Sequence, residues 1–111
     1  MNIAEYKDVY VFAEQRDGKL QNVALELLGK ARELADANQE KVVAMLLGKD
    51  VKPLAQTLVE YGADRVLVVD HDLLKDYMTE PYTEAITQII KENKPSIMLI
   101  GATTIGRDLG P

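Results

Sequence analysis

The run Val42-Val-Ala-Met-Leu-Leu47 decides the fold of this chain, because it is hydrophobic at every position over the length of one strand. A strand with one wet face would alternate apolar and polar residues, whereas an unbroken run is typical of a strand covered on both faces in a parallel sheet. Three other runs have the same character: Val9–Ala13, Val66–Val69 and Ile97–Ile100. The sequence therefore predicts four buried strands that lie parallel in one sheet.

The segment between the first two runs has the period of a helix. Its apolar residues recur at spacings of three and four, which places them on one helix face. These residues are Leu20, Val23, Ala24, Leu27, Leu28, Ala31, Leu34 and Ala35. We expect this helix to cover one face of the sheet.

Two further helices are predicted after the second and third runs. The first contains Val51, Leu54, Ala55 and Leu58, and it ends at Gly62, whose tolerance of positive φ suits a helix C-cap. The other is indicated by the spacing of Tyr82, Ala85, Ile86, Ile89 and Ile90. Thr79 is its expected N-cap, Pro81 lies in its first turn, and Pro95 stops it.

Strands and helices thus alternate in the order β-α-β-α-β-α-β. Short connections between them imply right-handed crossovers and a three-layer α/β sandwich with a parallel sheet. A fourth helix, seeded by Thr103 to Leu109, is expected to cover the last strand, so residues 1–111 are expected to form an incomplete domain. Ligands of such sheets bind beyond the carboxyl ends of the strands.

The composition excludes several partners and chemistries. A net charge of −5 repels phosphate backbones and anionic lipid, so neither nucleic acid nor a membrane is an expected partner. The absence of cysteine removes disulfides, thiol nucleophiles and iron–sulfur ligation. No targeting segment precedes the first strand and no apolar run is long enough to cross a bilayer, so a cytoplasmic protein is expected.

The turn Gly101-Ala-Thr-Thr-Ile-Gly-Arg107 is the leading candidate for a site. A strand-to-helix turn can bind an anion or a cofactor with backbone N–H groups. Gly101 allows a close approach of the backbone, Thr103 or Thr104 can cap the helix, and Arg107 offers a fork of donors. The turn matches neither the P-loop nor the Gly-x-Gly-x-x-Gly fingerprint. A plain capped helix start, with Arg107 in solvent, is the alternative.

Two other loops at the same edge carry polar residues. Asp70-His71-Asp72 holds the only histidine, but catalysis or metal binding would need further groups, so we favour a turn cap. Glu14 and Arg16 follow the first strand where a ligand would lie, yet Asp17-Gly18 favours an ordinary turn there.

Taken in order, several segments resemble the N-terminal part of the electron transfer flavoprotein α subunit. They are Val11–Glu14, Arg16–Lys19, Leu25–Ala35, Tyr61–Asp64, Val68–His71, Tyr82–Ala85 and Pro95–Leu109. The form of Gly101–Arg107 is similar to that in α subunits of anaerobes, some of which bifurcate electrons from NADH.

The resemblance implies a heterodimeric carrier, not an enzyme, that passes electrons from acyl-CoA or other dehydrogenases to an acceptor oxidoreductase. It implies an N-terminal domain with a fold like that of adenine nucleotide α-hydrolases and universal stress proteins, packed against the β subunit. FAD would be held mainly by a C-terminal domain, and the β subunit would carry AMP or a second FAD. Residues 1–111 alone would bind no cofactor. Gly101, Thr103, Thr104 and Arg107 would approach the partner or its cofactor.

The alternative is a small module of the universal-stress-protein type that binds ATP or AMP. The glycine-rich phosphate loop expected of ATP-binding members is absent, so this alternative ranks second. A purely structural interaction domain, in which the terminal turn only starts a helix, is a third interpretation.

An uncovered apolar flank beside Ile97–Ile100 predicts that the isolated 111-residue chain self-associates or is marginally stable. Sedimentation velocity over a range of concentrations measures this directly. A compact, cooperative monomer with a high unfolding midpoint would contradict the prediction.

Overall fold

The computed structural model describes residues 6–16, 18–75 and 79–101. Four parallel strands form the main sheet, in the order β5-β4-β1-β6. They are β1 (Val9–Phe12), β4 (Val42–Gly48), β5 (Arg65–Asp70) and β6 (Ile97–Leu99). Each lies within one residue of its predicted bounds, so the parallel sheet expected from the four apolar runs is confirmed.

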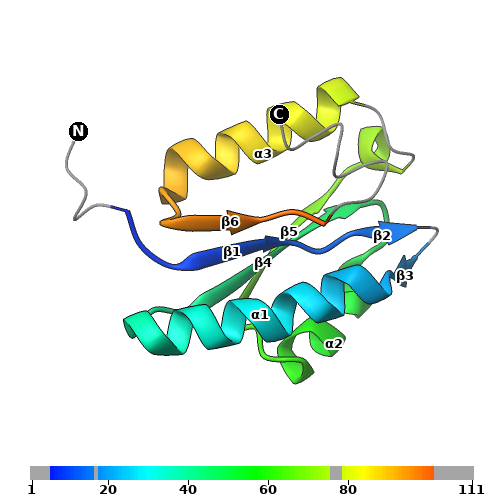
Figure 1. Cartoon of the computed structure of the whole chain (residues 1–111). Coiled ribbons are helices and arrows are strands. Elements are labelled where there is room, and N and C mark those ends of the chain that lie inside the picture. Colours follow the sequence, from blue (N-terminus) through cyan, green and yellow to red (C-terminus); the bar gives the residue numbers. More distant parts are fainter. Residues whose placement is uncertain (1–5, 17, 76–78, 102–111) are drawn as a thin grey trace.

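Helices cover both faces of this sheet (Figure 1), which confirms the three-layer sandwich. Two helices lie on one face, α1 (Asn22–Asn38) and α2 (Ala55–Glu60), and α3 (Thr79–Asn93) lies on the other. Single 3₁₀ turns precede α2 and α3, namely η2 (Lys52–Leu54) and η3 (Asp72–Leu74). A short antiparallel hairpin joins β1 to α1, formed by β2 (Gln15–Arg16) and β3 (Lys19–Leu20).

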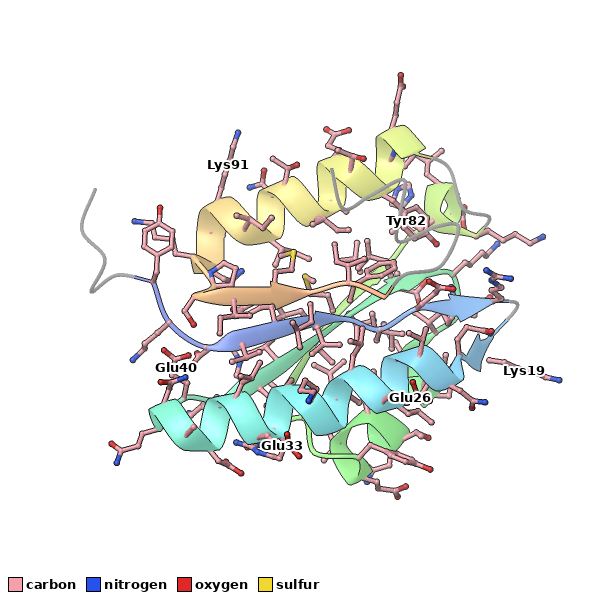
Figure 2. All side chains as sticks on the ribbon, viewed as in Figure 1. Lys19, Glu26, Glu33, Glu40, Tyr82 and Lys91 are labelled. Atoms are coloured by element: carbon pink, nitrogen blue, oxygen red, sulfur yellow. The ribbon has the colours of Figure 1, made fainter. Side chains whose placement is uncertain are left out.

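The two central strands, β1 and β4, are buried at every residue. Alternate side chains enter the two halves of the core: Val9 and Val11 pack toward α1, whereas Tyr10 and Phe12 pack toward α3. Tyr82 enters the second half from α3 (Figure 2), and its hydroxyl donates a 2.8 Å hydrogen bond to the carbonyl of Leu74. Period-two burial on both faces is what the continuous apolar runs require.

The outer strand β6 is only half-buried, from Ile97 to Leu99. Within the described residues it has one partner strand, β1. Partial exposure of this flank is what the sequence predicts. The fourth helix expected from Thr103 to Leu109 falls outside the described residues.

The structure corrects three local predictions. The sequence predicts Leu20 at the start of the first helical face, but it lies in β3, opposite Gln15, and packs on the core from there. The second helix begins with a 3₁₀ turn before Ala55, because Pro53 lacks the N–H that a longer helix would need. Thr79 is the first residue of α3 and not its cap. Gly62 ends α2 with φ of 117°, as predicted.

At the amino ends of the strands, Arg32 and Asp64 join α1 to the sheet. The Arg32 Nη1 donates to an Asp64 carboxylate oxygen at 2.8 Å and to the carbonyl of Gly62 at 3.0 Å. The same carboxylate oxygen accepts from the N–H of Val42 at 2.8 Å. The hydrogen bond from Val42, followed by that from Arg32, lowers the pKa of Asp64 below its usual value.

Replacing Asp64 by Asn should therefore lower the free energy of unfolding at pH 7, by about 1 kcal/mol because the pair is partly exposed. A carboxyl group whose pKa is lowered on folding stabilises above its unfolded pKa, and that contribution is lost as the pH falls through its folded value. Urea unfolding from pH 7 to acid should thus show the wild-type and Asp64→Asn proteins converging.

The matched control is Asp36→Asn, which removes the other carboxylate bonded to Arg32, at the more exposed end of the cluster. Its effect should be below about 0.5 kcal/mol, as for a surface pair within one helix. An Asp64→Asn effect that stays constant with pH would contradict the assignment.

Candidate functional site

The carboxyl edge of the sheet contains the point where the strand order reverses. The chain passes from β1 outward to β4 and β5, then returns to place β6 on the other side of β1. In open α/β sheets the loops diverge at such a point and leave a crevice where ligands bind. Here the crevice lies between the ends of β1 and β6, and Gly101 follows β6 at its border.

Gly101 is buried and packs against α1. A Cβ atom added to it would lie 2.6 Å from Cγ2 of Val23, so no larger residue fits without displacement. The predicted close approach of the backbone is thus present, but the group it approaches is a core side chain. Thr103, Thr104 and Arg107, the other predicted site residues, lie outside the described residues.

Glu14 stands beside the crevice, directly after the last residues of β1. Its side chain is 3% exposed, and it is the one buried charged side chain in the part of the chain that the structure describes. A carboxylate oxygen lies 3.5 Å from Nη2 of Arg16, whose side chain is 54% exposed. The sequence placed these two residues at the ligand edge, but it gave no indication that the carboxylate is buried.

Gln15 fixes the hairpin against the end of β4. Its amide Nε2 donates to the carbonyl of Leu47 at 3.1 Å, and its Oε1 accepts from the N–H of Gly18 at 3.1 Å. Gly48 makes this contact possible, because a Cβ there would lie 2.6 Å from the amide nitrogen of Gln15 and 2.6 Å from Cγ1 of Val51. Gly18 has φ of 79°, which agrees with the turn predicted at this position.

The Asp70-His71-Asp72 segment ties loops together, which supports the structural interpretation over catalysis. Asp70 accepts from the N–H of Asp50 at 3.1 Å, and Asp72 pairs with Lys49 at 3.2 Å. The cap of the 3₁₀ turn is His71 and not an aspartate, because its Nδ1 accepts from the N–H of Leu73 at 3.1 Å. Accepting at Nδ1 requires that this nitrogen carry no proton.

Two hollows open at this edge. One, of about 350 Å³, lies beside the hairpin and is lined by Gln15, Gly18, Lys49, Asp50 and Lys75. The other, of about 400 Å³, lies between η3 and α3 and is lined by Val69, His71, Leu73, Leu74, Pro81, Glu84, Ala85 and Gln88. The first brings cationic and acidic groups together, and the second is largely apolar.

Two searches of the described residues bear on other kinds of site. Among residues 6–16, 18–75 and 79–101, no three His, Cys, Asp or Glu side chains lie close enough together to hold a metal ion. No helix in that same part of the chain has the length and hydrophobicity needed to cross a membrane.

The fold and this edge define a doubly wound α/β domain whose crevice lies at the reversal of strand order. The family described as "Electron transfer flavoprotein domain" matches residues 9–111. The chain therefore belongs to the electron transfer flavoprotein family, as its sequence motifs indicate.

Curated relatives extend this result. The chain is 54% identical over 111 residues to the electron transfer flavoprotein subunit alpha of Megasphaera elsdenii, covering all of this chain and 33% of that protein. It is 48% identical over 110 residues to the acryloyl-CoA reductase electron transfer subunit beta of Anaerotignum propionicum, covering 99% of this chain and 30% of that protein.

A third relative is the lactate dehydrogenase (NAD(+),ferredoxin) subunit LctC of Acetobacterium woodii, which is 40% identical over 106 residues. That match covers 96% of this chain and 25% of the relative. The chain thus spans a third or less of the length of these three relatives.

The packing at Gly48 yields a prediction for stability. Gly48→Ala should lower the free energy of unfolding by about 1–3 kcal/mol, because Val51 is buried and Gln15 is held by two hydrogen bonds. Gly29→Ala is the matched control. Gly29 is exposed in the middle of α1 with open space around its Cβ position, so the same change should add about 0.5–1 kcal/mol. Equal effects in urea unfolding would contradict the packing argument.

Proposed function

We propose that residues 1–111 form the N-terminal domain of an electron transfer flavoprotein α subunit. The supporting observation is the family match over residues 9–111, together with α-subunit relatives that align with this chain end to end. The complete protein, on this proposal, is a heterodimeric electron carrier. This domain contributes the surface that binds the β subunit and catalyses no reaction itself.

The described residues bear on which part of a flavin nucleotide fits the crevice. The carboxylate of Glu14 can accept hydrogen bonds from N–H or hydroxyl groups, but it repels a diphosphate. No P-loop or dinucleotide fingerprint occurs in the chain. The residues therefore suit contact with the ring or sugar of a flavin whose diphosphate is held elsewhere, by a C-terminal domain or by the β subunit.

The protein's part in such a carrier is to orient the flavin and set the electrostatics around it, while the flavin carries the electrons. Gly101, Thr103, Thr104 and Arg107 form the edge that approaches the partner or its cofactor. Arg107 supplies a fixed positive charge and up to five N–H donors for a carboxylate or a polar ring edge.

The partners follow from the relatives. One is named as a subunit of an acryloyl-CoA reductase and another as a subunit of an NAD(+),ferredoxin lactate dehydrogenase. We infer that this protein likewise serves an acyl-CoA or other dehydrogenase in the cytoplasm. The second name supports the finer proposal that the carrier is of the bifurcating type, with a second FAD in the β subunit in place of AMP. Nothing in the described residues favours the nucleotide-binding alternative.

The deciding experiment purifies the native α subunit together with its β subunit and counts the bound cofactors. Two FAD per heterodimer are expected for a bifurcating carrier, whereas one FAD with AMP would indicate an ordinary one. A colourless complex would overturn the flavoprotein proposal.

The site proposal has its own variant. Arg107→Ala in this complex should weaken association of the subunits or alter the absorption spectrum of a bound flavin, because a charged donor is lost at the edge. Lys19→Ala is the matched control, since Lys19 is an exposed cation of the β2–β3 hairpin (Figure 2). If Arg107→Ala changes neither property, these four residues are not part of the interface.

A further inference from the structure

We infer that Glu14 and Arg16 act as a pair that sets the electrostatic potential in the crevice between β1 and β6, and thereby the reduction potential of the flavin beside it. This inference rests on the proposed function, which supplies the flavin. It concerns positioning residues that no comparison assigns.

The first argument is the cost of the charge. Removing a carboxylate from water is unfavourable, and a cationic partner compensates only part of the lost hydration. The guanidinium of Arg16 lies 3.5 Å away and is itself more than half exposed. A glutamine would fill nearly the same space at a lower desolvation cost, so stability alone does not favour a charged group at this position.

The second argument is position. Glu14 follows Ala13, whose N–H continues the strand ladder by donating to the carbonyl of Met45 at 2.9 Å. On the other side of β1, the register pairs Val11 with Leu99. Continued by two residues, that register brings Ala13 level with Gly101. The buried carboxylate therefore comes from the strand that borders the crevice, at the level of the turn after β6.

The third argument is rigidity. Arg16 belongs to the β2–β3 hairpin, and the carbonyl of Glu14 accepts from the N–H of Gln21 at 3.0 Å, which closes the base of that hairpin. Gln15 binds the hairpin to the end of β4 through the bonds to Leu47 and Gly18. Both members of the pair thus project from a segment fixed at three points, so their separation is held by the backbone and not only by mutual attraction.

These features decide the sign of the effect. A negative charge near a flavin opposes the addition of an electron and lowers its reduction potential, while a positive charge raises it. Glu14 is the buried member, so its field is screened less by solvent than that of Arg16. The intact pair should therefore give a small net negative contribution, and loss of either member should unbalance it in a predictable direction.

The test uses the full-length α subunit in complex with its β subunit, and the measurement is the midpoint potential of each bound flavin by spectroelectrochemical titration. Glu14→Gln should shift one flavin potential in the positive direction, because the cation remains. Arg16→Gln should shift the same potential in the negative direction, and the double variant should lie between the two single variants.

Glu33→Gln is the matched control, since it makes the same change of charge on the outer face of α1 (Figure 2), where Glu33 is 78% exposed. Its flavin potentials should equal those of the wild type. The heterodimer and its flavin content must be intact in every variant that is compared.

The outcomes separate this inference from the proposed function. A heterodimer that contains flavin, but whose potentials do not move in Glu14→Gln or Arg16→Gln, overturns the inference and leaves the proposed function standing. A heterodimer without flavin overturns both. If Glu14→Gln fails to assemble, the exposed Arg16→Gln variant decides, and an unshifted potential in that variant is sufficient to reject the pair's role.

Discussion

The double burial of β1 and β4 is the constraint on which the rest of this domain depends. Both strands are covered at every residue, so apolar side chains project from each face and each face needs its own cover. Each fully buried valine or leucine contributes about 1.5–3 kcal/mol, which makes the loss of either cover prohibitive. Parallel strands also need long crossovers, and those crossovers are the helices that provide the cover. The sheet and its two helical layers therefore form one arrangement.

That arrangement places the candidate site. With β4 on one side of β1 and β6 on the other, crossovers on the two faces must diverge at the carboxyl end of β1. The neighbouring gap, between β1 and β4, is occupied by the amide of Gln15, which the missing side chain of Gly48 admits. The gap toward β6 has Glu14 and Gly101 at its border. Backbone topology thus selects one crevice, and two small sequence features close the other.

The fold was predictable from the sequence to within one residue at each of the four strands, because a short, continuous apolar run between turn residues is typical of a strand buried on both faces. Local features were harder. The position of Leu20 in β3 depended on two hairpin residues on each side of a turn, too short to show a period-two pattern. The cap by His71 used a side chain that capping preferences do not favour. The site, in turn, was predictable as a location but not as a chemistry. The rule for open α/β sheets selects the loops that contain Glu14 and Gly101, yet burial of Glu14 depends on contacts between residues far apart in the chain, which bring the hairpin down over the end of β4.

The two ends of the sheet treat their charges differently, and this difference supports a functional interpretation of the carboxyl end. At the amino end, the carboxylate of Asp64 is partly exposed and accepts hydrogen bonds from both Val42 and Arg32, as expected of a group that joins α1 to the sheet. At the carboxyl end, Glu14 is buried more deeply and the guanidinium of Arg16 lies farther away. A stabilising role would favour the first arrangement at both ends. The second arrangement keeps a charge close to the crevice, where a cofactor or partner can respond to it.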